Sequence, residues 1–323
     1  MAMESKYIWM DGKLVEFEKA TVHFLTPALH YGLGVFEGIR CYNTSKGPAV
    51  FRLREHLERL VDSLEILGVR EFPYSVEQLR QAVHETISVN EFSECYIRPL
   101  IYMAHGLLGL NLDASRPAVG IAVWEWGAYL GEEALEKGVR MMISSFTRHH
   151  PNVNMTKAKI TGNYPNSVMA KTFAVRAGFD EAIMLDPNGL VSECTGENLF
   201  VVRGGKIYTT PRTSILEGIT RDALITIARD LGYEVIEEQI SRDQLYIADE
   251  VFLSGTAAEC VSVTEIDYRK IGAGKAGPVA RALQKAFHDA VRGKDAKYES
   301  WLDYVADSQV AVDLTQLASA PAD

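Results

Sequence analysis

Strands are predicted first where hydrophobic and polar residues alternate or where apolar residues run together. Residues 7–17 (YIWMDGKLVEF) alternate around Asp11 and Gly12, which is typical of a β-hairpin with a two-residue turn. Two apolar, β-rich runs follow at 95–103 (CYIRPLIYM) and 118–126 (AVGIAVWEW), and we expect both to be buried strands.

A different spacing lies between these strands and predicts helices. Residues 53–69 carry apolar side chains three or four positions apart: Leu53, Leu57, Leu60, Val61, Leu64 and Leu67. Residues 75–87 begin with Ser75 and Gln78, a capping box that marks a helix start. With the strands, these helices predict an α+β domain over roughly the first 125 residues.

The second half of the chain predicts a larger, β-rich domain. Gly178 and Gly232 close two expected helices, and Pro278 stands in the first turn of a third. The strands are expected within 139–146, 181–193, 198–210 and 250–263, and the helices within 166–178, 220–232 and 278–293.

The chain is long enough, at 323 residues, for two domains. We expect a small N-terminal domain over 1–126 and a polar, glycine-punctuated interdomain loop over 127–138. The large domain is expected over 139–306, followed by a frayed tail over 307–323 that is rich in Ala, Ser and Asp.

Composition and charge exclude several classes of protein. Hydrophobic residues make up 47% and no run approaches the ~18 apolar residues of a membrane span. The net charge of -10 argues against nucleic-acid binding, which needs a basic surface. The N-terminus has no apolar signal core, and Cys41, Cys95, Cys194 and Cys260 are scattered, as expected of reduced thiols in a cytoplasmic protein.

Two short motifs carry little weight. Residues 272–277 (GAGKAG) match a dinucleotide fingerprint, but no apolar strand precedes them and no acid follows at the right distance, so a turn is predicted. Residues 148–150 (RHH) have no third His or carboxylate at ligand spacing, so no metal is expected.

One constellation does indicate chemistry. Lys157 and Lys159 precede a Gly-Asn-Tyr-Pro turn, and spacing alone does not choose between them. Residues 218–220 (GIT) and 254–259 (SGTAAE) are small, hydroxyl-bearing turns that offer N–H groups to a phosphate, and Glu193 ends a strand. A lysine for an aldehyde, turns for a phosphate and an acid for a ring nitrogen are the requirements of pyridoxal 5'-phosphate (PLP).

Eight stretches in order then resemble one family, the fold-type IV (class IV) PLP aminotransferases, and most closely its branched-chain amino acid aminotransferases. They lie between residues 30 and 259 and read HYGLGVFEGIR, HLERL, YIRPL, WGAYLG, KITGNY, SECTGENLF, EGITRD and ADEVFLSGTAAE, and the resemblance as a whole runs from about residue 7 to residue 305. The resemblance implies a two-domain α+β and α/β fold, a small N-terminal and a larger C-terminal domain, and a homodimer with the site at the domain and dimer interface.

The resemblance also implies roles for the cofactor residues. Lys159, five residues before Tyr164, is expected to hold PLP as a Schiff base and to act as the catalytic base, with Lys157 a bystander. Tyr164 is expected at the ring hydroxyl and Glu193 at the ring nitrogen. The remaining expected contacts are the phosphate ligands Arg59, Gly218, Ile219, Thr220 and Thr256, with Leu216 packed on the ring.

The substrate pocket that the resemblance implies draws on both domains and on the partner subunit. Its expected residues are Phe36, Gly38, Arg40, Tyr96, Arg98, Trp126, Tyr129, Ala257 and Ala258, with Tyr31 and Leu110 from the partner. Relatives often carry a smaller β-branched residue in place of Leu110, which implies a different pocket size. Arg98 lies in an apolar strand, where a charge needs a ligand or a structural ion pair.

The implied activity is ping-pong transamination of L-leucine, L-isoleucine and L-valine with 2-oxoglutarate, giving branched 2-oxo acids and L-glutamate. The alternatives within the fold are a D-amino acid or (R)-amine transaminase and an aminodeoxychorismate lyase. A non-catalytic PLP-binding protein is a third class, against which the intact Lys159 and Glu193 argue.

Overall fold

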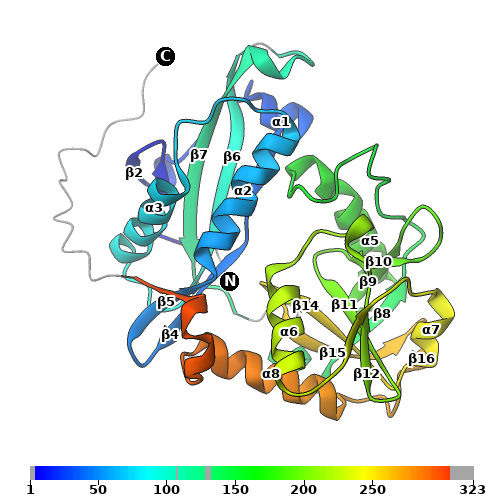
Figure 1. Ribbon diagram of the computed structural model, residues 1–323. Coiled ribbons are helices and arrows are strands. Elements are labelled where there is room, and N and C mark those ends of the chain that lie inside the picture. Colours follow the sequence, from blue (N-terminus) through cyan, green and yellow to red (C-terminus); the bar gives the residue numbers. More distant parts are fainter. Residues whose placement is uncertain (1–3, 107, 128–131, 306–323) are drawn as a thin grey trace. The chain divides into compact units, whose positions relative to one another are not determined.

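The computed structural model describes residues 4–106, 108–127 and 132–305 and divides the chain into two compact units (Figure 1). Of these described residues, unit 1 holds those up to Trp126, the short segment Ala158–Gly162 and residues 291–305. Unit 2 holds Gly127–Lys157 and Asn163–Ala290.

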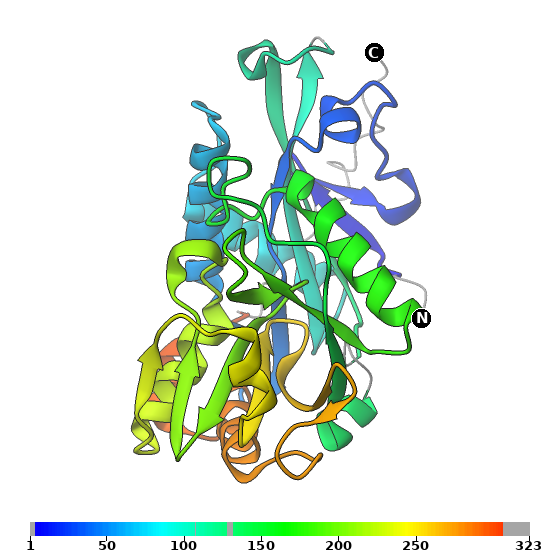
Figure 2. The same cartoon turned by 90° about the vertical axis from the view of Figure 1, so that its right-hand side faces the viewer.

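Unit 1 is built on a largely antiparallel sheet in the order β17-β5-β4-β6-β7-β1-β2, with β3 paired to β6. Its strands are β1 (Tyr7–Met10), β2 (Lys13–Glu16), β3 (Gly34–Phe36), β4 (Ile39–Thr44), β5 (Gly47–Phe51), β6 (Cys95–Gly106), β7 (Ser115–Trp124) and β17 (Leu302–Tyr304). Its α-helices are α1 (Pro27–Tyr31), α2 (Leu53–Leu67) and α3 (Val76–Val89). The β6–β7 hairpin projects from the body of unit 1 (Figure 2).

The predicted hairpin and both predicted helices of unit 1 are confirmed. Met10 pairs with Lys13, and Asp11 and Gly12 both take positive φ, as a two-residue turn requires. Ser75 and Gln78 form the reciprocal capping box of α3. The leucines of α2 at positions 53, 57, 60 and 64 are almost fully buried in one core with residues of the sheet and of α3.

Unit 2 contains a mixed sheet in the order β10-β9-β8-β15-β14-β11-β12-β13, with β16 paired to β15. Its strands are β8 (Val139–Ile143), β9 (Glu181–Leu185), β10 (Val191–Cys194), β11 (Asn198–Arg203), β12 (Lys206–Thr209), β13 (Val235–Glu237), β14 (Glu250–Gly255), β15 (Glu259–Ile266) and β16 (Arg269–Lys270). Its α-helices are α4 (Glu132–Lys137), α5 (Tyr164–Arg176), α6 (Ile219–Asp230), α7 (Arg242–Tyr246) and α8 (Pro278–Val291).

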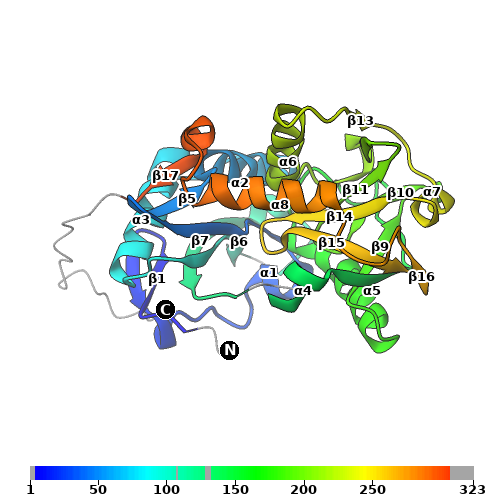
Figure 3. The ribbon, with the colours of Figure 1, turned by 90° about the horizontal axis from the view of Figure 1, so that it is seen from below.

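The helices of unit 2 pack directly on its sheet. The α5 helix lies on β9 and the α6 helix on β14. The α8 helix runs beside β14 and β15 (Figure 3), where Gln284 Nε2 donates to the Cys260 carbonyl at 2.9 Å. The expected strands and helices of this half are all present, although α5 begins at Tyr164, two residues earlier than predicted.

The two units divide the chain differently from the sequence-based domains. The expected interdomain loop 127–138 includes helix α4, which packs on β15, and its residues 128–131 lie outside the described part. Segment Ala158–Gly162 joins unit 1 because Ile160 is buried there and bridges to Val35. The chain after α8 also joins unit 1, through the β17–β5 pairing. The expected frayed tail, 307–323, lies outside the described residues.

The last described strand is attached to helix α3 through Asp303. Arg80 Nε and Nη2 donate to the two Asp303 oxygens at 2.6 and 2.7 Å, and His84 Nε2 lies 3.2 Å from Oδ1. Burial raises the pKa of Asp303, but His84 and Arg80 outweigh burial and lower it from 3.8 to about 2. The stabilisation is therefore complete above the ordinary pKa and is lost as the pH falls toward 2.

Asp303→Asn is expected to lower the free energy of unfolding by about 1–3 kcal/mol at pH 7, because it removes charge-assisted hydrogen bonds. The difference from the wild type should narrow at pH 3. Urea unfolding midpoints at pH 7, 4 and 3 measure both effects. Glu77→Gln, which removes the exposed partner of Arg80, is the control and should change little. If the variant and the wild type differ in unfolding free energy by the same amount at pH 7 and pH 3, the ionised Asp303 carboxylate is not the source of the stabilisation.

Candidate functional site

The two candidate lysines have different surroundings. Lys157 lies in unit 2, where its Nζ donates to the carbonyls of Arg212 and Ile215 and lies 3.3 Å from Glu217 Oε1. Its ammonium therefore holds a loop in place. Lys159 lies in unit 1, half-buried, with its Nζ 5.1 Å from the centre of the Phe36 ring.

The backbone around Lys159 is anchored on both sides. Its N–H donates to Ser63 Oγ at 3.0 Å, and its carbonyl accepts from the Phe36 N–H at 3.1 Å. Gly162 N–H donates to the Gly32 carbonyl, and a Cβ built on Gly32 would lie 2.7 Å from the Gly162 Cα. Gly32 also has a φ of 65°, so two requirements select glycine there. The lysine side chain thus extends from a fixed backbone position.

Arg59, the predicted phosphate ligand, lies on α2 and pairs with an acid that the sequence analysis did not single out. Its Nε and Nη2 donate to the two Glu37 oxygens at 2.7 and 2.8 Å. Glu37 is fully buried and also contacts His56 Nδ1 at 2.8 Å. Burial raises the pKa of Glu37, but Arg59 and His56 outweigh it and hold the pKa well below its usual value. Burial lowers the pKa of His56.

The predicted pocket residues of β4 and β6 lie against one another. Tyr96 packs edge-on to Trp126, with ring centres 4.3 Å apart. A Cβ built on Gly38 would lie 2.0 Å from the Tyr96 hydroxyl, so only glycine lets that hydroxyl approach the strand. Arg40 Nη2 reaches the Trp126 carbonyl at 3.5 Å and lies 3.7 Å from Glu94.

Arg98 lies among aromatic rings. Its guanidinium carbon is 4.7 Å from the centre of the Phe36 ring, 5.3 Å from Tyr96 and 5.9 Å from Trp124. Its Nη2 donates to the Tyr96 hydroxyl at 3.0 Å, while its buried Nε has no hydrogen-bond partner among the described residues. Within the described residues no carboxylate pairs with Arg98, so the structural ion pair considered above is not found there.

The remaining predicted substrate residues of unit 1 are exposed. Tyr31, the last residue of α1, is 42% exposed, and Leu110, between β6 and β7, is 93% exposed. Such exposure leaves both side chains available to a second molecule. Tyr129 lies outside the described residues.

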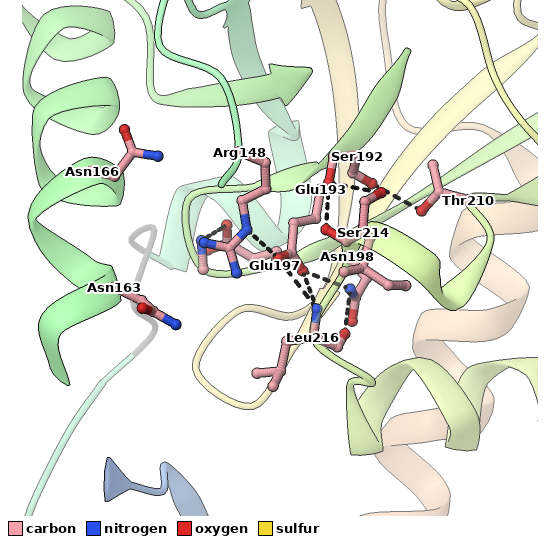
Figure 4. Close-up of polar contacts among 12 residues, drawn as sticks. Arg148, Asn163, Asn166, Ser192, Glu193, Glu197, Asn198, Thr210, Ser214 and Leu216 are labelled. Carbon is pink, nitrogen blue, oxygen red and sulfur yellow. Dashed lines mark hydrogen bonds and ion pairs between the residues drawn. The ribbon is translucent and has the colours of Figure 1, made fainter. Parts of the chain in front are cut away.

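Glu193 is the centre of a hydrogen-bond cluster in unit 2 (Figure 4). It lies on β10 and is 5% exposed. Arg148 Nε donates to its Oε1 at 2.6 Å, Asn198 Nδ2 to its Oε2 at 3.1 Å, and the Leu216 N–H to Oε2 at 3.1 Å. Arg148 therefore supplies a positive counter-charge to this buried carboxylate, and the other donors fix its orientation.

The predicted phosphate turn is the amino end of helix α6. Its N-cap is Gly218, which has no side chain to cap the first turn. A Cβ built on Gly218 would lie 2.1 Å from Asn198 Oδ1, so the turn lies close against the residue that also binds Glu193. The first-turn N–H groups, which belong to Ile219, Thr220 and Arg221, carry the positive end of the helix dipole, which favours an anion.

The second predicted turn, Thr256 to Ala258, joins β14 to β15. Ala258 is buried, while Thr256 and Ala257 are half-buried. Ser254, just before this turn, has a buried hydroxyl without a hydrogen-bond partner. Tyr164 is the half-buried first residue of α5.

The sequence analysis missed several supporting residues. Arg148 was weighed only as part of a metal motif, and no three His, Cys, Asp or Glu side chains of the described residues gather as metal ligands. Asn198 offered no signal either. For His56 and Ser63 a signal existed, because both are polar residues on the buried side of an amphipathic helix.

These residues fit PLP by the chemistry of their groups. Unit 2 provides a buried acid paired with Arg148, beside the first turn of helix α6, which suits a pyridine nitrogen and a phosphate. Unit 1 provides an anchored lysine and an arginine held by a buried acid. Each of the two sets is thus assembled within a single unit.

Comparison with known proteins identifies the class of protein. The class IV aminotransferase family model matches residues 34–266, and the chain belongs to this family. A branched-chain-amino-acid aminotransferase of Pseudomonas aeruginosa is 47% identical over 301 residues, which cover 93% of this chain and 98% of the relative.

Two solved structures are similar over 94% of this chain and 100% of theirs. A branched-chain amino acid aminotransferase from T.th. with pyridoxamine 5'-phosphate has a TM-score of 0.91 and 51% identity. The same enzyme complexed with N-(5'-phosphopyridoxyl)-L-glutamate has a TM-score of 0.90 and 50% identity. The predicted family and fold class are thereby confirmed. No helix in the described part is long and apolar enough to cross a membrane.

Proposed function

We propose that the protein transfers the amino group of L-leucine, L-isoleucine and L-valine to 2-oxoglutarate with PLP as its cofactor. The observation that carries the substrate assignment is Arg98, a cation with an unsatisfied Nε among the rings of Phe36, Tyr96 and Trp124. These three rings offer apolar contact to a branched side chain, and the Arg98 guanidinium offers a positive charge to a γ-carboxylate. The names of the relatives support the same pair of substrates.

When bound, PLP supplies an aldehyde for an amine and a ring that accepts electrons from the substrate Cα–H bond. The chain supplies the proton chemistry. Lys159 Nζ extends from a backbone position that Ser63 and Phe36 hold. As a general base it would remove the Cα proton of the amino acid, and as a general acid it would then deliver that proton to the cofactor's C4′ carbon.

Glu193 keeps a proton at the ring nitrogen. Arg148 pairs with its carboxylate, and Asn198 and the Leu216 N–H set its orientation toward one further hydrogen bond, from the ring nitrogen. Arg59 and the first turn of α6, from Gly218, hold the phosphate, and Thr256 adds a donor. Tyr164 donates to the ring hydroxyl, and the N–H groups of Ala257 and Ala258 hold the substrate carboxylate.

The working form is a homodimer in the cytoplasm. The exposed Tyr31 supports this assignment, because it lies in a run with the exposed Val22, Phe24, Leu25 and Leu29, and gathered apolar exposure is typical of a protein–protein interface. Sedimentation of the purified holoprotein measures the oligomeric state. A monomer would leave Tyr31 without a role in the pocket.

A substrate panel tests the function directly. L- and D-forms of leucine, isoleucine, valine, alanine and phenylalanine, together with (R)-1-phenylethylamine, are each supplied with 2-oxoglutarate, and glutamate formation is followed. The L-branched-chain amino acids are expected to give the highest kcat/KM. Preference for D-amino acids or (R)-amines would contradict the proposal, as would a PLP-bound protein with no turnover.

Arg98→Leu is expected to raise KM for glutamate and 2-oxoglutarate ~10-fold or more, since a charge-assisted hydrogen bond of roughly 1.5–3 kcal/mol is lost. KM for leucine should rise less, and the PLP absorbance should not change. Steady-state kinetics with glutamate and with leucine measure how much KM rises for each substrate. Arg116→Leu, at an exposed arginine on β7, is the control. Equal losses for both substrates would assign Arg98 to the fold instead.

A further inference from the structure

The Glu37 carboxylate connects the predicted phosphate ligand to the predicted substrate pocket. It lies between Phe36 and Gly38, two expected substrate residues, and its own N–H donates to the Pro99 carbonyl at 3.0 Å, next to Arg98. Its side chain is fully buried and holds Arg59 by two parallel hydrogen bonds of 2.7 and 2.8 Å.

Two parallel hydrogen bonds do more than pair charges. A guanidinium on a long side chain has many rotamers, and a two-point contact fixes both its position and its plane. His56 Nδ1 holds the acid from another side, at 2.8 Å from Oε2. The Arg59 guanidinium is therefore ordered before any ligand arrives, so that a phosphate does not have to order it.

The same turn of α2 also reaches the lysine. Ser63 Oγ donates to the Arg59 carbonyl at 2.7 Å and accepts the Lys159 N–H at 3.0 Å. The predicted phosphate ligand and the predicted Schiff-base lysine are thus held by one short stretch of helix, within one unit. An acid that orders Arg59 orders it relative to the lysine.

We propose that Glu37 is a positioning residue that sets the Arg59 guanidinium for the cofactor phosphate. This rests on the proposed function, in which Arg59 binds that phosphate. A purely structural ion pair makes a different prediction. Loss of Glu37 would then weaken the fold and the binding of every ligand alike, whereas a positioning role concerns the phosphate alone.

The test compares PLP with pyridoxal, which has the same aldehyde and ring but no phosphate. Dissociation constants of both are measured on the apoprotein by the absorbance of the bound chromophore, and the thermal unfolding of the apoprotein is recorded beside them. For Glu37→Gln we expect the dissociation constant of PLP to rise about 10-fold or more and that of pyridoxal to change less than about 2-fold.

Glu58→Gln is the matched control, because it removes the partner of Arg54 on the exposed side of the same helix. It should leave both constants unchanged. In the Arg59→Gln variant, adding Glu37→Gln should leave the preference for PLP over pyridoxal, the ratio of their dissociation constants, unchanged. The double variant also serves if Glu37→Gln alone folds poorly, because it leaves no unpaired charge buried.

Each result supports or overturns the proposal. Equal weakening of PLP and pyridoxal by Glu37→Gln overturns it, as does no change in either. The proposal is also overturned if Glu37→Gln, added to the Arg59→Gln variant, further weakens the preference for PLP over pyridoxal. A wild-type protein that does not prefer PLP over pyridoxal contradicts the proposed function itself, which separates the two failures.

Discussion

Lys159→Ala is expected to abolish transamination, whereas Lys157→Ala should retain most of it. The two lysines stand two residues apart, and the Lys157 ammonium donates to the loop carbonyls of Arg212 and Ile215. Without the Lys159 amine no group of the chain is assigned to move the Cα proton, and a lost general base typically costs 10²–10⁴-fold or more. Single-turnover reaction of each variant with L-leucine, followed by absorbance, measures the loss.

Lys157→Ala controls for general damage to this segment. Its loop contacts predict a lower unfolding temperature with a nearly normal rate. A Lys157→Ala protein that is inactive but folded, next to an active Lys159→Ala protein, would reverse the assignment of the two lysines.

Glu193→Gln is expected to retain PLP but to lose on the order of a hundredfold or more in kcat. A neutral amide cannot hold the proton at the ring nitrogen, so stabilisation is lost in the transition state rather than in binding. Steady-state kinetics and the cofactor content of the purified variant measure the two effects separately. Because the change also leaves Arg148 without its buried counter-charge, unfolding should begin at a lower temperature.

Glu181→Gln is the control that separates the loss of rate in Glu193→Gln from its loss of stability. Glu181 is a fully buried acid on β9 that pairs with Lys171 at 2.6 Å and accepts from Thr195. Its loss should lower the unfolding temperature comparably and leave kcat nearly unchanged. A Glu193→Gln protein with a near-normal rate would mean that another acid faces the ring nitrogen.

Features that depend on neighbouring residues were predictable from the sequence. The Asp11-Gly12 turn and the Ser75–Gln78 capping box are decided within four residues, so their chemistry can be read directly. Helix α4 is a local feature that was missed. Its glycine-punctuated flanks favoured a loop, but Ala134 is buried in the core of unit 2, and this packing favours the helix.

Features that depend on distant partners were not predictable. Arg148 and Glu193 are 45 residues apart, and nothing near either one predicts the pair. Ile160 belongs to unit 1 only because Val35 lies opposite it. The choice of Lys159 over Lys157 came from the family resemblance, and the spacing of the two lysines alone did not supply it.

The most direct test of the account locates the cofactor on the chain. The holoprotein is reduced with borohydride, digested, and the peptide that carries the pyridoxyl group is sequenced by mass spectrometry. We expect the group on Lys159. A pyridoxyl group on Lys157 or Lys171, or no labelled peptide from a protein that is active with L-leucine, would contradict it.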